Sequence, residues 1–282
     1  MLIDFHTHVF PAKIAARSVK ALTDGIYRMQ GADYRAGESL ACREATVKGL
    51  LDSMRTAGVD RSICLPVATK VSQIPTINRY AQNVTRYGNA NGKIVESFGG
   101  MHPADPNWEA VLESLAVQGF HGFKLHLQFQ QAYIDSPEVI RILQKAETLG
   151  LYAVFHAGED IGLPPPVYAT PERISHLFDY MCGDHLIGAH LGGWEMWDDV
   201  ERYLVGTPML FDTAFIARFI SPEQCVRIFR NHGTDKILFG SDSPWEDPAE
   251  TLACLQSLPL TDHEMAQITH ENALRVLGET VC

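Results

Sequence analysis

Short apolar runs rich in β-branched and aromatic residues recur along this chain, and after each run the apolar residues recur at the spacing of an amphipathic helix. The pattern therefore predicts a repeating unit of one strand followed by one helix. Because no long series of hairpins interrupts the repeat, we expect parallel strands joined by right-handed crossovers. The eight expected strands cover residues 2–9, 61–67, 94–101, 122–127, 151–156, 186–190, 209–213 and 236–240.

The boundaries of several helices are marked by capping residues. Ser136, Thr170 and Ser221 each stand directly before a proline, as does Asp105, which places a capping side chain in front of proline at the first helical position. Eight strand–helix units predict an α/β fold, a TIM (β/α)8 barrel, with a doubly wound open sheet as the competing architecture. Glycines that mark helix ends follow the amphipathic stretches at positions 58, 119, 150 and 233.

Two segments depart from the repeat. Residues 10–42 are too long for a simple connection, and we expect them to form a small helical insertion in an otherwise single domain that covers residues 1–282. Residues 162–170 contain three consecutive prolines and are expected to be extended. Both segments follow strands, so both are expected on the catalytic face of the barrel, with the insertion over the barrel mouth.

The composition is that of a globular protein, with 46% apolar and 20% charged residues. The net charge of −11, without a cluster of Lys and Arg, argues against binding to nucleic acids or anionic membranes. The amino terminus lacks a basic region followed by an apolar stretch, and no Cys-x-x-Cys pair occurs, which together favour a reduced, cytoplasmic protein. The six cysteines stand at positions 42, 64, 182, 225, 254 and 282.

His6 and His8 are two residues apart on the first predicted strand, so their imidazoles project to the same side. They face the barrel interior if Ile3, Phe5 and Thr7 face the surrounding helices. Two neutral imidazoles at that place suit a divalent ion of the zinc type. The alternative is a pair of buried histidines that are satisfied by ordinary hydrogen bonds.

Further residues with metal-binding or proton-transfer chemistry stand at the ends of later predicted strands. Lys124 and His126 belong to the fourth strand, His156 ends the fifth, His190 ends the sixth and Asp242 follows the eighth. Because the carboxyl ends of barrel strands meet at one face, we expect these side chains to converge with the first-strand pair. Of the other histidines, His102 closes strand three, and surface or packing roles are favoured for those at positions 121, 176, 185, 232, 263 and 270.

The ordered motifs DFHTH, GFKLH, FHAG, AHLGG, GSDSP and ENALRVLG resemble those of the amidohydrolase superfamily, and most closely its amidohydrolase-2 (aminocarboxymuconate-semialdehyde-decarboxylase-like) TIM-barrel family of metal-dependent hydrolases. The resemblance covers residues 1–278. It implies that His6, His8 and His156 are metal ligands and that Asp242 is both a ligand and the proton carrier. It also implies that His190 binds a second metal or, in a site with one metal, polarises the substrate and shuttles a proton.

Lys124 has two readings. In superfamily members with two metals, a lysine at this strand position is carboxylated and bridges the ions, which is the reading that the resemblance offers. The other reading makes Lys124 a structural lysine or, together with His126 on the same face of the strand, a binding group for a substrate carboxylate. The second reading fits a site with one ion, which we favour.

Four residues on the predicted loops could line a pocket for a compact organic substrate: Phe10, Glu159, Trp194 and Trp245. For the two tryptophans, simple packing of loops is an equally good explanation. Nothing in the sequence identifies the substrate, and the oligomeric state, including a homodimer, is left open.

The leading functional hypothesis is hydrolysis of a small amide, lactone or ester by metal-activated water, with Asp242 as general base. The alternative is non-oxidative decarboxylation of an unsaturated or aromatic acid, in which Asp242 and His190 deliver a proton to carbon. A silent metal-binding scaffold is disfavoured because both ligands and a proton-transfer carboxylate are present. A nuclease is disfavoured by the acidic charge and the missing basic groove.

Overall fold

The computed structural model describes residues 1–35 and 39–280, and it shows the TIM-barrel fold that the repeat predicts. Every pair of neighbouring strands in the two sheets is parallel. Cys282 lies outside the described residues. The strands are β1 (Ile3–Thr7), β2 (Arg61–Cys64), β3 (Ile94–Ser97), β4 (Gly99–Gly100), β5 (Gly122–Leu125), β6 (Tyr152–Phe155), β7 (Leu186–Gly188), β8 (Leu210–Asp212) and β9 (Ile237–Leu238).

The third predicted strand, 94–101, is interrupted at Phe98, so that β3 pairs with β2 while β4 pairs with β5. The N–H of Phe98 still donates to the carbonyl of Cys64 at 2.9 Å. Its ring packs edge-on against Phe5, with 5.5 Å between the ring centroids. The interruption divides the ring of strands into a sheet of β1–β3 and a sheet of β4–β9.

Backbone hydrogen bonds join the last strand to the first. The N–H of Phe5 donates to the carbonyl of Phe239, and the N–H of Asp242 donates to the carbonyl of His6, both at 2.8 Å. These bonds pair the edge of β1 with the chain around β9. They also fix Asp242 beside the first-strand histidine, although the two residues are far apart in sequence.

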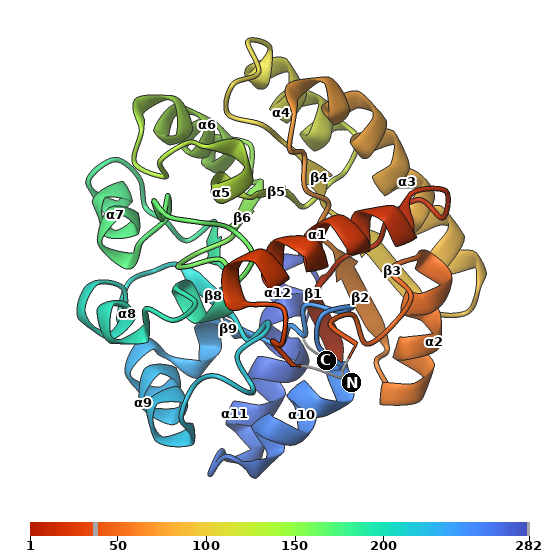
Figure 1. Cartoon of the computed structure of the whole chain (residues 1–282). Coiled ribbons are helices and arrows are strands. Elements are labelled where there is room, and N and C mark those ends of the chain that lie inside the picture. The colour runs from red at the N-terminus through yellow and green to blue at the C-terminus, as the bar shows by residue number, and fades with distance from the viewer. Residues whose placement is uncertain (36–38, 281–282) are drawn as a thin grey trace.

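The helices surround the ring of strands (Figure 1). They are α1 (Ala15–Gln30), α2 (Val47–Ala57), α3 (Ile74–Ala90), α4 (Trp108–Val117), α5 (Leu127–Gln130), α6 (Pro137–Thr148), α7 (Pro171–Ser175), α8 (Trp197–Tyr203), α9 (Pro222–His232), α10 (Pro248–Ser257), α11 (Asp262–Ala266) and α12 (Asn272–Val276). Short helical turns add η1 (Val71–Gln73), η2 (His176–Asp179), η3 (His190–Gly192), η4 (Thr234–Lys236) and η5 (Gln267–Glu271).

The predicted helix caps are confirmed in three of four cases. The hydroxyls of Ser136, Thr170 and Ser221 cap α6, α7 and α9, and each accepts a backbone N–H three residues further along. Asp105 does not cap a helix. Its carboxylate accepts the N–H of Asn107 at 2.9 Å, which closes a turn of two residues and delays the start of α4.

The apolar core has two parts. The larger part fills the space between the strands and the outer helices. The smaller part takes side chains from β1, β2, β6, β7, β8 and β9, which can meet only inside the ring, together with residues of α12. The interior is thus largely a packed apolar core, and the side chains with metal-binding chemistry gather at its upper end, at the carboxyl ends of the strands.

The direction of two first-strand side chains corrects the expectation from simple alternation. Ile3 and Phe5 do not face the helices; both belong to the interior cluster. The pairing of β1 with β2 shifts between Asp4 and Thr7, which inserts one extra residue on β1. Because of this bulge, Phe5 and His6 both face the interior, whereas strict alternation would put them on opposite sides.

Helix α1 lies across the barrel in the view of Figure 1. It rests on the loop after β6: the side-chain amide of Gln30 donates to the carbonyl of Ile161 at 3.2 Å, and a Cβ at Gly25 would lie 3.0 Å from the carbonyl oxygen of Gly162. The division into one domain with an insertion over residues 10–42 stays a prediction, and residues 36–38 of that segment lie outside the described residues.

Among residues 1–35 and 39–280, no helix combines the length and the apolar character that a membrane span requires.

Candidate metal centre and active site

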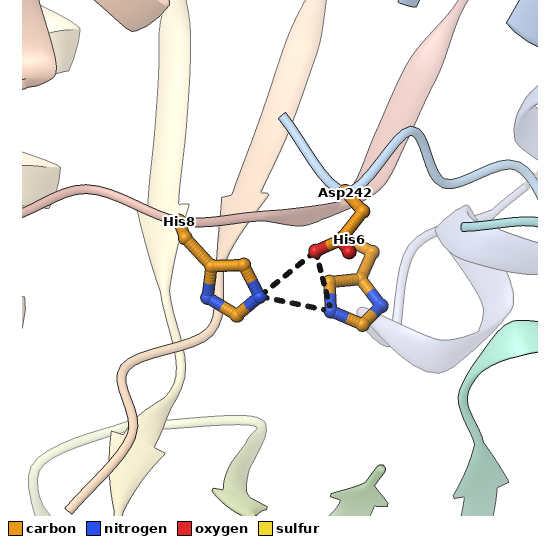
Figure 2. A group of neighbouring side chains, drawn as sticks. All are labelled: His6, His8 and Asp242. Carbon is orange, nitrogen blue, oxygen red and sulfur yellow. Dashed lines mark hydrogen bonds and ion pairs between the residues drawn. The ribbon is translucent and has the colours of Figure 1, made fainter. Parts of the chain in front are cut away.

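Three side chains meet at the carboxyl end of β1 (Figure 2). Nε2 of His6 lies 3.1 Å from Nε2 of His8, and Oδ1 of Asp242 lies 3.1 Å from the latter atom and 3.5 Å from the former. His6 is almost completely buried, and His8 and Asp242 are only slightly exposed. The side chains come from both ends of the sequence. The backbone hydrogen bonds between β1 and the chain around β9 bring them together.

A neutral imidazole ring carries one hydrogen, and in both rings we place it on the nitrogen that lies nearer to a carbonyl or carboxylate oxygen. Nδ1 of His6 lies 2.7 Å from Oδ2 of Asp212, and Nδ1 of His8 lies 2.8 Å from the carbonyl of Leu65. Burial lowers the pKa of His6 well below its usual value, so this ring is neutral. Its Nε2 therefore presents a lone pair.

The three central atoms are consequently all acceptors: Nε2 of His6, Nε2 of His8 and an oxygen of Asp242. Acceptors this close together repel one another unless positive charge lies between them. Two imidazole nitrogens and one carboxylate oxygen are ligands that zinc and related divalent ions accept, so these residues fit a metal ion.

His156 and His190 form a second pair at the same centre. Nδ1 of His190 donates to the carbonyl of Ala214, and Nε2 of His156 donates to the carbonyl of Glu159, both at 2.8 Å. The other two nitrogens, Nε2 of His190 and Nδ1 of His156, lie 3.0 Å apart. The ring centroid of His190 is 5.4 Å from that of His6. His156 and His190 thus offer two further nitrogens to an ion or to a proton.

The backbone at the centre is strained at two of these residues. His190 and Asp242 have φ values of 57° and 64°, in the left-handed region that few residues other than glycine adopt. Each conformation is held by hydrogen bonds: the N–H of His190 donates to Asp212 at 2.9 Å, and that of Asp242 to the carbonyl of His6. Strain of this kind is typical of residues whose side chains must point at a reacting group.

Lys124 reaches the same centre from β5. Its side chain is almost completely buried, and Nζ lies 3.4 Å from Nε2 of His6. Burial lowers the pKa of Lys124 to about 8, although the carboxylates of Asp212 and Asp242 favour the charged form. Lys124 therefore places a buried amine directly beside His6.

His126 lies directly after β5, and its ring stacks on that of His156 with 4.4 Å between the centroids. Nε2 of His126 lies 3.3 Å from Oδ2 of Asp160, and Nε2 of His156 lies 3.9 Å from the same oxygen. These three residues form a second group whose geometry could accept an ion. The structure thus brings seven predicted residues into one region: His6, His8, Lys124, His126, His156, His190 and Asp242.

The predicted pocket residues on the loops are placed differently. The carboxylate of Glu159 is exposed, and it is the carbonyl of this residue that faces His156. Trp194 is buried against Phe219, with 5.2 Å between the ring centroids. The side chain of Trp245 is half-buried, and the backbone N–H of this residue donates to the backbone carbonyl of Asp242 at 2.9 Å. Phe10 is also half-buried.

Among the described residues, none of the groups that could hold a metal ion includes His102. Its Nδ1 accepts the N–H of Ala104 at 3.1 Å and so closes a turn after β4.

Sequence reasoning missed four acids around the centre, three of them buried and the fourth, Asp160, only slightly exposed. Asp212 ends β8 and orients both His6 and His190. Asp4 accepts from the N–H and hydroxyl of Ser241, and burial raises its pKa to about 7. The other two are Asp160 and Glu246, and burial raises the pKa of Glu246 to about 7. Asp4 and Asp212 could have been noticed as acids inside otherwise apolar strand runs, whereas Asp160 and Glu246 lie in loops that give no such signal.

The loop that carries His156 depends on a glycine. Gly158 has a φ of 82°, and a Cβ there would lie 2.2 Å from the backbone nitrogen of Trp194. We expect Gly158→Ala to lower the free energy of unfolding by ~2 kcal/mol or more, because strain and a backbone collision add. The matched control is Gly206→Ala, where φ is 87° but nothing lies within 4 Å. Denaturant unfolding measures both, and equal losses would contradict the collision.

The comparisons agree with this architecture. The family model described as Amidohydrolase matches residues 3–278, so the chain belongs to the amidohydrolase family. This confirms the resemblance that the sequence motifs carry. No curated protein matches the chain significantly.

Solved structures similar to this chain include several enzymes with named activities. A 5-carboxyvanillate decarboxylase from Novosphingobium aromaticivorans, complexed with manganese, has a TM-score of 0.73 and 14% identity and covers 99% of this chain and 96% of its own. A 2,6-dihydroxybenzoate decarboxylase from Rhizobium has a TM-score of 0.67, 16% identity and 98% coverage of both chains. A probable 2-pyrone-4,6-dicarboxylic acid hydrolase from Acinetobacter baumannii has a TM-score of 0.64 and 17% identity and covers 98% of this chain and 99% of its own.

The leading hypothesis from the sequence, hydrolysis of an amide, lactone or ester, is corrected by these comparisons. The similar structures with named activities are mostly metal-dependent decarboxylases of aromatic acids, which favours the alternative. The physical reason for the error is that a metal, its histidines and a proton-carrying carboxylate serve both reactions, so the motifs could not choose between them. The family and the donor set support a divalent metal, without identifying it as zinc.

Proposed function

We propose that this protein is a metal-dependent, non-oxidative decarboxylase of an unsaturated or aromatic carboxylic acid. The observation that carries the proposal is that decarboxylases of this chemistry share the fold over 98–99% of this chain. The site supports it, because the buried Lys124 offers an ammonium group beside the proposed metal position. A small carboxylate entering the barrel mouth would meet positive charge there.

The proposed reaction breaks the bond between the carboxyl carbon and the adjacent carbon. The electron pair of that bond stays on the adjacent carbon, carbon dioxide leaves, and one proton must be delivered to the carbon. A bound divalent ion, held by His6, His8, His156 and Asp242, would supply a Lewis acid that orients the substrate and stabilises developing negative charge. Asp242 and His190 lie at the centre and are the groups that we assign to proton transfer.

We propose that the site holds one divalent ion and that Lys124 acts as an ammonium group. Zinc was the expectation from the sequence, and manganese suits the same mixture of nitrogen and oxygen ligands. The residues assigned to the metal are His6, His8, His156 and Asp242. The residues assigned to the substrate are Lys124, His126, Glu159, Trp194 and Trp245, with Glu159 acting through its backbone.

The test is release of carbon dioxide from a panel of hydroxylated benzoic acids and unsaturated dicarboxylic acids, with the protein loaded with Zn²⁺ or Mn²⁺. We expect decarboxylation of at least one class, loss of activity after removal of the metal by a chelator, and recovery when the ion is restored. Elemental analysis should find one ion per chain. Two ions would instead favour a carboxylated, bridging Lys124, and activity that survives complete removal of the metal would contradict the proposal.

Location and partners remain proposals. We place the protein in the cytoplasm, since the five described cysteines are all free thiols. Its partner is proposed to be a small-molecule substrate, with neither nucleic acid nor membrane involved, and a homodimer is the assembly to examine first.

A further inference from the structure

His126 has a buried polar atom that nothing in the fold explains. The residue is 9% exposed, and its Nδ1 has no hydrogen-bond partner among the described residues. A buried nitrogen without a partner carries a free-energy cost that is normally avoided. At the mouth of a barrel enzyme, such an atom is a place for a ligand group to bind.

The hydrogen-bonding character of this atom follows from Asp160. A neutral histidine ring carries one hydrogen, on either Nδ1 or Nε2. Nε2 lies 3.3 Å from Oδ2 of Asp160, and a carboxylate can only accept, so the hydrogen is on Nε2. Nδ1 of His126 is therefore left as an acceptor.

The strand register gives the direction of this acceptor. Leu125 pairs with Phe155, so His126 and His156 are neighbours on adjacent strand ends. Their rings are nearly parallel, with 11° between the planes, and both turn Nε2 toward Asp160. Two stacked rings attached in this way have Nδ1 on the same side. Since Nδ1 of His156 faces Nε2 of His190, we place Nδ1 of His126 on the same side, toward the centre.

We propose that the His126–Asp160 pair is a specificity element that recognises a hydroxyl group of the substrate. Nδ1 of His126 accepts the hydroxyl hydrogen, and Asp160 is the positioning residue that keeps the ring in this tautomer. The inference rests on the proposed function in one respect, because it takes the ligand to be a carboxylic acid held by Lys124. It assigns to Asp160 a role that the sequence gave no reason to suspect.

The same cluster does not fit a second metal ion in this tautomer. An ion shared by His126, His156 and Asp160 needs a lone pair on both Nε2 atoms. Nε2 of His156 lies 2.8 Å from the carbonyl of Glu159 and so carries a hydrogen, and Nε2 of His126 carries one toward Asp160. The lone pairs are on the Nδ1 atoms instead.

The experiment measures binding and does not require turnover. Ortho-, meta- and para-hydroxybenzoate are each compared with the fluorobenzoate of the same substitution, which has a similar size and no hydrogen to donate. Calorimetry on the metal-loaded protein gives the affinities. We expect at least one hydroxy acid to bind about tenfold tighter than its fluoro analogue, because the fluoro compound leaves Nδ1 unpaired.

Two substitutions at His126 separate hydrogen bonding from packing. His126→Phe keeps a ring to stack on His156 but removes the acceptor. We therefore expect the hydroxy acid and its fluoro analogue to bind with about equal affinity. His126→Asn places an amide oxygen near the position of Nδ1, and we expect it to keep part of the preference. Asp160→Asn should reduce the preference severalfold. The amide NH₂ can donate to Nε2, which allows the ring hydrogen to move to Nδ1 and removes the acceptor there.

The matched control is Asp135→Asn, which alters a second His–Asp pair away from the metal centre: Nδ1 of His176 lies 3.0 Å from Oδ2 of Asp135. It should leave the preference unchanged. The inference is overturned if no hydroxy acid is preferred, if neither acid of any pair binds, or if the preference survives in His126→Phe. It is also overturned if Asp160→Asn loses one equivalent of metal, since that identifies the cluster as a cation site. If the unaltered protein releases no carbon dioxide from any acid but still prefers the hydroxy acid, only the proposed decarboxylation is refuted.

Discussion

Replacement of His6 by alanine is expected to give a protein that no longer retains a divalent ion and releases no measurable carbon dioxide. Nε2 of His6 is fixed as a lone-pair donor, because Nδ1 is bound to the fully buried Asp212. Removing the ring deletes one proposed ligand and leaves Nε2 of His8 and the carboxylate of Asp242 without the third donor of the central group. Elemental analysis after dialysis, together with the activity assay, measures the effect.

Because His6 is buried, its replacement could also weaken folding, and a second variant keeps the prediction decisive. His8→Ala removes a ligand that is partly exposed and should cause the same loss of metal with little loss of stability. His121→Ala is the control, since this half-exposed histidine immediately precedes β5, at the opposite end from Lys124. If folded His6→Ala and His8→Ala proteins hold as much metal as the unaltered protein, the first-strand pair is not the metal site.

Replacement of Asp242 by asparagine is expected to separate metal binding from proton transfer. Asparagine keeps one oxygen toward the metal and tolerates the left-handed backbone at this position, so the fold and most of the bound ion should remain. The amide cannot take up and deliver a proton, and we expect the rate of carbon dioxide release to fall by about a hundredfold or more. Steady-state kinetics and elemental analysis on the same preparation measure both effects.

The control for this substitution lies in the same loop. Asp247 caps α10 through a hydrogen bond from the N–H of Ala249, and asparagine is an equally good capping residue. Asp247→Asn should therefore leave both metal content and rate close to those of the unaltered protein. Full activity of Asp242→Asn on a substrate that the unaltered protein decarboxylates would remove Asp242 from the proton-transfer step.

The sequence by itself determined the order of strands and helices and the residues at the strand ends. Those features follow from local physics: apolar periodicity selects the element, and a hydroxyl before proline starts a helix, as at Ser136 and Thr170. Parallel strands then carry His6, His156 and Asp242 to one end, because each strand must run the same way. The meeting of distant polar residues was therefore predictable without knowledge of any contact.

Only the tertiary structure decided how these side chains are oriented. The bulge in β1 depends on its register against β2, and it turns both Phe5 and His6 inward against the alternation of the sequence. The hydrogen on the ring of His6 is fixed by Asp212, which is 206 positions away, and the one on His126 by Asp160. Such partners are set by the register of the strands and the path of the loops, and apolar periodicity carries no information about either. The sequence pattern therefore predicted which residues lie at the centre, but not which of their atoms face it.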